Sequence, residues 1–212
     1  MKKCMMYVVA LSMTTVAYAD DDSYAIEKNS GIYASAKFGY MGVRVKTKVE
    51  EYSEPVYSGT DDAPNMRGVV LAVGYKINPW FRFELEGGGF LPHYLGGGQA
   101  AETTIVTGMG QLYVDFPISN IPMKPYLNLG AGFLCYDGRL DSDGRDLSVT
   151  MGYDSLGIGL TYSFSEQLTL DASYRYAVTG RSSVTWDEGG KPYRQTLSLV
   201  TSTVLVGVRY IF

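Results

Sequence analysis

The sequence lacks several features that define common classes of protein. After residue 19 no apolar run approaches the about 20 residues that a membrane-spanning helix needs. There are two cysteines, Cys4 and Cys135, and one histidine, His93. Asp and Glu outnumber Lys and Arg by 22 to 18, and no basic stripe marks a surface for nucleic acid. These scarcities argue against a helical membrane protein, a disulfide framework and a nucleic-acid-binding protein.

The first nineteen residues have the pattern of a secretory signal peptide. Lys2 and Lys3 precede a modest apolar stretch at 5–16, and Ala17-Tyr18-Ala19 places small residues at the two positions that signal peptidase reads. We therefore expect residues 1–19 to be removed; an N-terminal buried strand is the alternative. Without Lys2 and Lys3, 16 basic residues remain against 22 acidic ones, an expected net charge of −6.

The remainder has the composition of a single all-β domain. We expect residues 20–30 to be a polar periplasmic lead-in and 31–212 to be one domain. Cys135 is then the one remaining cysteine, so no intramolecular disulfide can form. Tyr occurs 18 times and Gly 25 times, and turn-punctuated chains rich in both are typical of β-sandwiches and β-barrels.

Apolar residues alternate with small or polar ones in eight segments, which is the period of a β-strand. In the first segment, Ile32, Ala34 and Phe38 share one face, and Lys37 lies on the other. An even number of strands is what single-chain bacterial barrels require. The segments are 31–45, 67–77, 80–91, 103–116, 125–136, 148–163, 168–179 and a closing segment that ends at Phe212.

Alternation alone fits both a membrane barrel and a soluble, lipocalin-like barrel. The polar face is dominated by Gly, Ser and Asn, which suits a narrow packed lumen better than a solvated surface. The apolar face is fringed by Tyr, Phe and Trp80, as an aromatic girdle requires. We therefore predict an all-β fold, an eight-stranded antiparallel up-and-down transmembrane β-barrel.

The lengths of the connections predict how the barrel is oriented. Short links alternate with longer polar ones, which is the pattern of periplasmic turns and extracellular loops in outer-membrane barrels. We expect both termini in the periplasm and four extracellular loops. The short links are 78–79, 117–124 and 164–167, and the long ones are 46–66, 92–102, 137–147 and 180–195.

Several segments resemble the OmpA-type transmembrane domain and related opacity and surface-antigen barrels. Tyr33-Ala34-Ser35-Ala36-Lys37-Phe38-Gly39-Tyr40 is similar to that family's opening strand, Phe83-Glu84-Leu85 to its third, and Leu170-Asp171 to Tyr174-Arg175-Tyr176 to a frequent seventh. The resemblance implies that Lys37 and Glu84 are partners in a luminal ion-pair network. It departs from the OmpA pattern at Thr161 and Asp171, where a second luminal Glu and an Arg are expected, and Arg82 and Arg175 are the candidate replacements.

The last strand also resembles the closing strand of these barrels, which the assembly machinery reads as a tag. Val204, Val206, Val208, Tyr210 and Phe212 share one face, and Gly207 and Arg209 lie on the other. The resemblance implies that Gly207, Tyr210 and Phe212 form the assembly signal, that Phe212 faces lipid and that Arg209 faces the lumen.

The charges on the predicted luminal face nearly balance, which favours paired charges in a filled interior over a steady channel. An unpaired buried charge would be costly. A small channel for ions or solutes remains the alternative. The positive residues are Lys37, Lys76, Arg82, Arg175 and Arg209, and the negative ones are Glu84, Glu86, Asp115 and Asp171.

Two patterns could carry chemistry but have simpler interpretations. His93, in the loop that follows the third segment, could be the base of a rim-site hydrolase, but no orienting Ser or carboxylate lies beside it in sequence. Asp137, Asp141, Asp143 and Asp146 could bind calcium but lack the full ligand array, so a solvated acidic turn is favoured. We expect no enzyme activity, metal or cofactor.

The expected function is that of a non-enzymatic surface protein of the outer membrane, acting in envelope integrity and in surface recognition or antigenic display. The expected partners are outer-membrane lipids and lipopolysaccharide, the barrel-assembly machinery, and an extracellular or host protein bound through 46–66 and 180–195; the protein is expected to be a monomer. Aromatic residues on mobile loops are good contact residues for a protein partner. The candidates here are Tyr52, Tyr57, Trp186 and Tyr193.

Overall fold

Alternating sequence produces antiparallel strands throughout the part of the chain that the structure describes. The computed structural model describes residues 30–51, 54–92, 103–118, 123–139, 146–188 and 191–212. Within these ranges no helix is long and apolar enough to cross a membrane. The strands are β1 (Gly31–Glu51), β2 (Glu54–Lys76), β3 (Phe81–Pro92), β4 (Thr104–Asp115), β5 (Met123–Arg139), β6 (Asp146–Ser163), β7 (Leu168–Thr179), β8 (Ser182–Glu188) and β9 (Lys191–Ile211).

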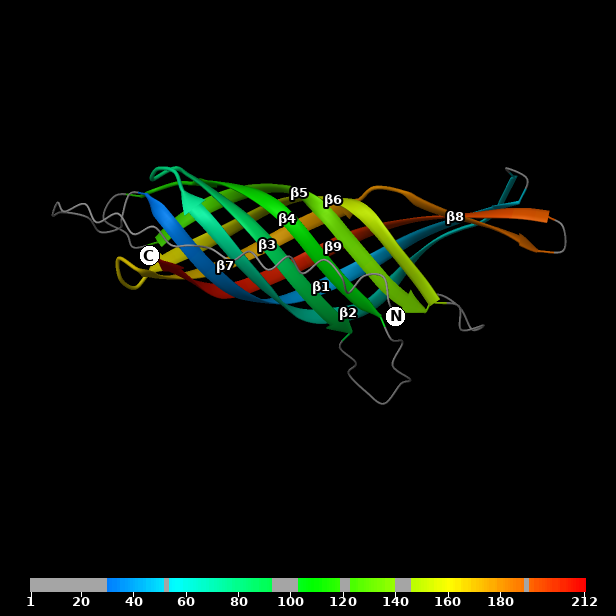
Figure 1. The fold of residues 1–212 in the computed structure, drawn as a ribbon, viewed down its shortest axis with the longest axis horizontal. Helices are drawn as coiled ribbons and strands as arrows, with labels where there is room; N and C mark the ends of the chain where they lie inside the picture. The colour runs from blue at the N-terminus through cyan, green and yellow to red at the C-terminus, as the bar shows by residue number, and fades with distance from the viewer. Residues whose placement is uncertain (1–29, 52–53, 93–102, 119–122, 140–145, 189–190) are drawn as a thin grey trace.

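Eight of these strands form a closed ring, which confirms the predicted fold (Figure 1). Each strand from β1 to β6 pairs antiparallel with the next, β7 pairs with β9, and β9 pairs with β1. Closure satisfies the backbone hydrogen bonds of the ring without leaving an edge. Strand β8 is not a ninth strand of the barrel wall. It pairs with β9 beyond the point where β7 ends, and an irregularity at Gly180 separates β7 from β8.

The wall of the barrel is apolar outside and polar or tightly filled inside. On β3, Phe83 and Leu85 point outward and are 40% and 54% exposed, whereas Arg82 and Glu84 between them are fully buried. This is the reverse of a water-soluble fold, in which burying charges and exposing apolar residues would both cost free energy. Hydrocarbon around the wall resolves both costs.

Glycines on the luminal face leave room for large side chains on the neighbouring strand. Gly74 on β2 is paired with Tyr33 on β1, and a Cβ atom added to Gly74 would lie 2.3 Å from the Tyr33 ring. Gly130 on β5 is paired with Gln111 on β4, where the corresponding distance is 2.4 Å. Glycine is therefore required at these two positions by packing across the strands, even though it weakens strands in general.

Two segments predicted as loops are strands instead. Residues 46–66 belong mostly to a hairpin of β1 and β2 whose pairing reaches Glu51 and Glu54, and 180–195 belong mostly to a hairpin of β8 and β9. The prediction was wrong because a strand that leaves the membrane needs no apolar outer face, so its polar composition resembled that of a loop. Val43, Val45, Thr47 and Val49 are β-branched residues at alternate positions and favour a strand, but no such alternation continues through 50–66.

Together these hairpins form a four-stranded sheet that extends past the rest of the barrel (Figure 1). Its order is β2-β1-β9-β8, and β1 pairs with β9 as far as Glu51 and Tyr193. By contrast, β3 ends at Pro92, which is paired with Met66 of β2. We call residues 43–51, 54–65, 182–188 and 191–200 the projecting sheet. The end of the barrel that carries it is the projecting end, and the opposite end, where β1 begins and β9 ends, is the base.

The other two predicted loops have different outcomes. Pro92, the first residue of the predicted loop 92–102, is the last residue of β3, and 93–102, including His93, lie outside the described residues. The predicted loop 137–147 is shortened at both ends, because β5 extends to Arg139 and β6 begins at Asp146. Asp141 and Asp143 lie outside the described residues, as do the predicted signal peptide and most of the lead-in.

Candidate functional site

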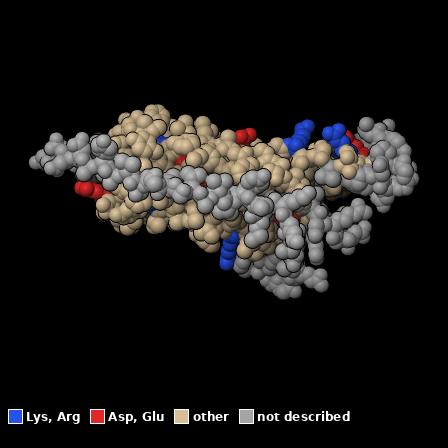
Figure 2. Space-filling model, viewed as in Figure 1, with Lys and Arg blue, Asp and Glu red and all other residues tan. Residues whose placement is uncertain are grey.

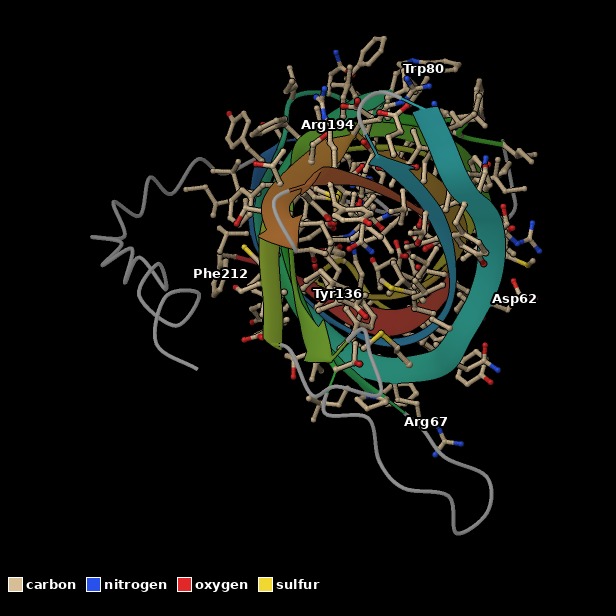
Figure 3. All side chains as sticks on the ribbon, turned by 90° about the vertical axis from the view of Figure 1, so that its right-hand side faces the viewer. Asp62, Arg67, Trp80, Tyr136, Arg194 and Phe212 are labelled. Carbon is tan, nitrogen blue, oxygen red and sulfur yellow. The ribbon has the colours of Figure 1, made fainter. Side chains whose placement is uncertain are left out.

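The candidate functional regions are the lumen of the barrel and the projecting sheet. All nine luminal charges predicted from strand parity are buried in the barrel. Figure 3, a view into the ring from the projecting end, shows side chains occupying the interior, whereas Trp80 and Phe212 lie outside the ring. The charged residues lie in the half of the lumen nearer the base; Arg82, for example, is the second residue of β3, and Asp115 is the last residue of β4.

Glu84 is the centre of the first group of luminal charges. Lys37 Nζ lies 2.7 Å from Glu84 Oε2, and Arg82 Nη1 lies 3.2 Å from Glu84 Oε1. The Tyr113 hydroxyl donates to Glu84 Oε2 at 2.8 Å. The carboxylate thus receives three donors, two of them charged, which compensates for its removal from water.

Arg82 extends the same group to two further carboxylates. Its Nε donates to both oxygens of Asp115, at 3.1 and 3.0 Å, and its Nη2 lies 3.8 Å from Asp171 Oδ2. The guanidinium also lies over the Tyr113 ring, 3.8 Å from its centroid. Asp171 in turn accepts a hydrogen bond of 2.7 Å from the Tyr126 hydroxyl. Arg82 thereby connects the carboxylates of Glu84, Asp115 and Asp171.

A second group lies further toward the middle of the lumen. Arg175 forms a two-point ion pair with Glu86, and its Nη2–Oε2 distance is 3.0 Å. Gln111 Nε2 donates to Glu86 Oε1 at 3.3 Å and to Ser155 Oγ at 3.1 Å. Asn128 Nδ2 donates to Gln111 Oε1 at 2.9 Å. These hydrogen bonds connect the Glu86–Arg175 ion pair to β4 through Gln111, to β5 through Asn128 and to β6 through Ser155.

The remaining predicted charges occupy the same half of the lumen. Arg209 on β9 lies over the Tyr33 ring, 5.2 Å from its centroid, and Lys76 is buried at the end of β2. The prediction did not include Tyr33, Gln111, Tyr113, Tyr126 and Asn128 among the functional residues. Four of them, Tyr33, Gln111, Tyr126 and Asn128, point inward directly opposite a glycine of the next strand, and that pairing is a signal the sequence could have provided.

The half of the lumen nearer the projecting end is apolar, which the prediction of a polar luminal face did not anticipate. Met41 and Val43 on β1, Met66 and Val70 on β2, and Phe90 on β3 all point inward and are buried. The same cluster continues around the ring through Ile105, Met109, Leu134, Tyr136, Val149, Met151, Tyr153, Ala177, Leu197, Leu199 and Leu205. Among the described residues, the lumen therefore contains two layers of buried side chains in series, one charged and one apolar.

The residues predicted to form the assembly signal lie at the seam between β1 and β9. Gly207 faces inward, paired with Lys37 on one side and Asp171 on the other. A Cβ atom at Gly207 would lie 2.2 Å from the Ala36 carbonyl oxygen, so this position needs glycine for packing. Tyr210 and Phe212 face outward and are exposed, with their ring centroids 5.3 Å apart.

Three of the four candidate surface-contact residues lie in the part of the chain that the structure describes. The Tyr57 side chain on β2 is half exposed, and Tyr193 on β9 is partly buried. Trp186 lies on β8, and its backbone pairs with that of Tyr193. Tyr52 lies outside the described residues. The structure thus places three of the four on the projecting sheet, along β2, β8 and β9.

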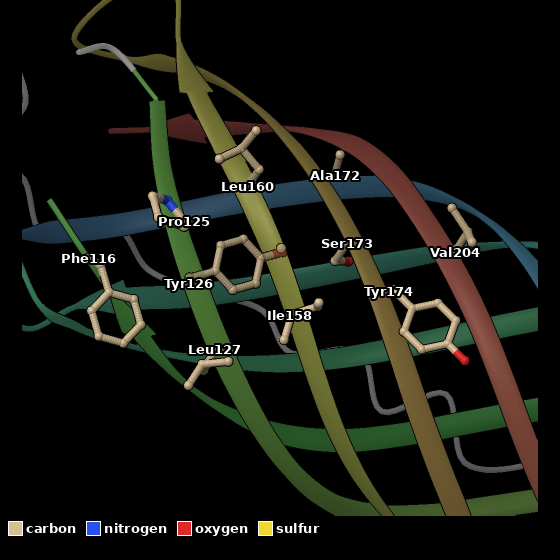
Figure 4. A pocket seen from close by; sticks show the side chains of 11 residues that line it. Phe116, Pro125, Tyr126, Leu127, Ile158, Leu160, Ala172, Ser173, Tyr174 and Val204 are labelled. Carbon is tan, nitrogen blue, oxygen red and sulfur yellow. The ribbon is translucent and has the colours of Figure 1, made fainter. Parts of the chain in front are cut away.

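A shallow pocket on the described residues lies on the outer wall (Figure 4). It has a volume of about 620 Å³ and lies above the small residues Pro125, Gly159 and Ala172, between ridges that include Phe116 and Tyr174. Its lining contains no charged side chain and it opens away from the lumen. Among the described residues no three His, Cys, Asp or Glu side chains are grouped to hold a metal ion.

A closed up-and-down barrel with an apolar outer wall and a filled polar lumen defines the class of outer-membrane β-barrels. The family model described as "Outer membrane protein beta-barrel domain" matches residues 7–212, and the chain belongs to that family. The predicted relationship to the OmpA-like and surface-antigen barrels is thereby confirmed, and the protein is one of the bacterial outer membrane.

Comparison with individual proteins supports the fold. An uncharacterized protein of Brucella suis biovar 1 is 26% identical over 200 residues, which covers 71% of this chain and 70% of the relative. Neisserial surface protein A is similar with a TM-score of 0.57 at 18% identity, covering 87% of this chain and all of that one. OprG of Pseudomonas aeruginosa is similar with a TM-score of 0.59 at 15% identity, covering 88% of this chain and 98% of that one.

Proposed function

We propose that this protein is a non-enzymatic surface protein whose barrel is a closed membrane anchor and whose projecting sheet is a contact surface for an extracellular partner. The observation that carries the proposal is the contrast between the two parts. The lumen is filled by two layers of buried side chains, while the sheet presents exposed side chains and a strand edge beyond the membrane. The pattern of short and long connections supports the orientation we propose, with the sheet outside the cell and the base in the periplasm.

The edge of the sheet supports recognition of a protein. Among the described residues β8 pairs with β9 alone, so its other side offers backbone donors and acceptors to an added strand. Residues 182–186, Ser-Ser-Val-Thr-Trp, contain no proline and no charged residue, the devices with which proteins blunt such edges. The edge on β2 carries both, at Pro55, Asp61, Asp62 and Pro64. The β8 edge is accordingly the side on which we place the partner.

Truncation of the two hairpins tests the contact surface. In β1–β2, residues 47–59 are replaced by Asn-Gly, which joins the paired residues Lys46 and Thr60. In β8–β9, residues 184–195 are replaced likewise, which joins Ser183 and Thr196. Each purified barrel is screened in detergent against an array of extracellular proteins, with heat-modifiable gel mobility as the control for folding.

We expect the intact protein to bind at least one member of the array and the β8–β9 truncation to lose that binding while its mobility shift on boiling persists. Binding that survives both truncations would contradict the proposal. A small channel is the alternative function. Stable conductance by the intact protein in a planar bilayer would show that the lumen is open and would replace the closed anchor with that alternative.

A further inference from the structure

The outward-facing residues of β1 change abruptly from aromatic to basic. Phe38 and Tyr40 are exposed on the apolar wall, and after Gly42 the same face continues with Arg44, Lys46 and Lys48. At about 3.3 Å per residue, Arg44 is roughly 13 Å beyond Tyr40 along the strand, and strand tilt brings this to roughly 10 Å along the membrane normal. The basic row therefore begins just beyond the aromatic girdle.

Arg67 on β2 marks the same boundary. It is paired with Tyr40 on β1 and with Leu91 on β3, and Leu91 is 61% exposed on the outer wall. Figure 3 shows the Arg67 side chain pointing away from the ring. A guanidinium with apolar neighbours on both sides is stable at a membrane surface when its long stem carries it to the polar headgroups.

The neighbours of the basic row suit a ligand with several acceptor oxygens. Lys46 is paired with Thr60 on β2 and Ser198 on β9, so hydroxyl donors flank the ammonium group on both sides. Lys48 is similarly placed between Ser58 and Thr196. Phosphate oxygens accept hydrogen bonds from hydroxyl, ammonium and guanidinium groups alike.

The charge of this face is opposite to that of the chain. Two carboxylates lie on it: Asp62, whose Oδ1 is 3.0 Å from Arg44 Nε, and Glu50, whose Oε1 is 2.5 Å from Lys48 Nζ. Among the side chains that the structure describes on this face, five basic residues, Arg44, Lys46, Lys48, Arg67 and Arg194, thus meet two acidic ones, on a chain with a net charge of −4. Figure 2 shows basic side chains emerging toward the projecting end, while most of the visible barrel wall is uncharged.

We propose that Arg44, Lys46 and Arg67, with the hydroxyls beside them, bind the phosphate groups of lipids in the leaflet that surrounds the projecting end. In the proposed orientation this is the outer leaflet, and the lipid is the phosphorylated anchor of lipopolysaccharide. The level of Arg67 within the wall favours a lipid over a soluble polyanion. Binding would hold the base of the projecting sheet against the membrane surface, whether or not the sheet also binds a protein.

The test measures retention of lipid A by the purified protein in detergent, using native mass spectrometry. The probes are bisphosphorylated lipid A, the same lipid without phosphate, and inorganic polyphosphate as a soluble anion. We compare Lys46→Gln, Arg67→Gln and the triple variant with Arg44→Gln against the matched control Arg194→Gln. Arg194 is exposed on the same sheet but is paired with Glu50, ten residues beyond Tyr40 along β1. Heat-modifiable mobility checks that each barrel is folded.

We expect the intact protein to prefer bisphosphorylated lipid A, and each neutralised residue to weaken binding about fivefold, as a basic residue near an anionic surface does. Arg194→Gln should bind as the intact protein does. Equal retention of the two lipids, equal loss in Arg194→Gln and Lys46→Gln, or binding of polyphosphate that matches that of lipid A would each overturn the proposal. These outcomes do not depend on the protein partner, so the proposed function can fail separately.

Discussion

Lys37 on β1 and Glu84 on β3 form a buried ion pair that passes over an entire strand. Their Nζ and Oε2 atoms are 2.7 Å apart, although β2 lies between the two strands in the ring. On β2, Lys37 is paired with Val70 and Glu84 with Gly74, and Ala72 lies between these two residues on the same inward face. The ion pair thus joins two strands that are not neighbours in the ring.

Neutralising Glu84 should be among the most destabilising single changes in the lumen. In Glu84→Gln, the buried Lys37 and Arg82 lose their shared carboxylate, and leaving buried charges uncompensated costs about 3–5 kcal/mol. The measurement is the free energy of unfolding in urea, with the protein reconstituted in lipid vesicles. Lys37→Met in the same chain should restore part of the loss. An unchanged urea midpoint in Glu84→Gln would show that the pair contributes nothing.

Adding a side chain at Gly74 should damage the packing of the same region. A Cβ atom there would meet the Tyr33 ring at 2.3 Å, so Gly74→Val should destabilise the barrel by about 1–3 kcal/mol. The fraction of refolded protein with heat-modifiable mobility is the readout. The second change Tyr33→Leu should recover part of the folding by removing the ring, because the added Cβ atom would still lie 2.6 Å from the Phe83 carbonyl oxygen. If the double variant shows no recovery of folding, the Tyr33 ring is not the obstacle.

Opening one layer of the lumen should not create a channel. Glu86→Gln with Arg175→Gln removes the central ion pair, but the apolar layer around Met41, Met66 and Phe90 still closes the path. Planar-bilayer recordings should therefore show no stable conductance from this double variant. Stable conductance by the double variant would mean that the charged layer alone closes the lumen and that ions pass through the apolar layer.

The proposed orientation can be checked with cysteine labelling. Cys135→Ser provides a background without the cysteine that precedes the third long connection, and Lys48→Cys or Gln167→Cys is then added. A membrane-impermeant maleimide applied to whole cells should label the Lys48→Cys variant and leave the Gln167→Cys variant unlabelled until the outer membrane is permeabilised. The reverse result would place the projecting sheet in the periplasm.

Strand parity was enough to predict the ring and the residues that face its lumen, because a period of two admits only two faces. Parity placed Lys37, Glu84 and Arg175 correctly on the luminal face. The same alternation also indicates that Met41 and Val43 point inward. What parity could not supply was the strand content of 46–51 and 54–66. Outside the membrane both faces of a strand meet water, so the contrast between the faces that identifies a strand disappears.

Contacts across the lumen were predicted only where a family resemblance supplied them. The partners of Arg82 come from β3, β4 and β7, and their approach depends on the stagger of the ring, which alternation does not encode. Tyr113 and Tyr126 have apolar rings, so the sequence pattern did not distinguish them from residues that only fill space in the lumen. Their hydroxyls donate to Glu84 and Asp171, and this role became visible only once the strands were in register.

Strands β1 and β9 join without a break from Tyr33 and Ile211 at the base to Glu51 and Tyr193 in the projecting sheet. The same two strands thus close the cylinder and reach out from it. A force that pulls the projecting sheet away from the barrel would run along these strands and load their hydrogen bonds together, in shear, instead of breaking them one at a time. The β1–β9 pairing that closes the barrel therefore also anchors the projecting sheet to it.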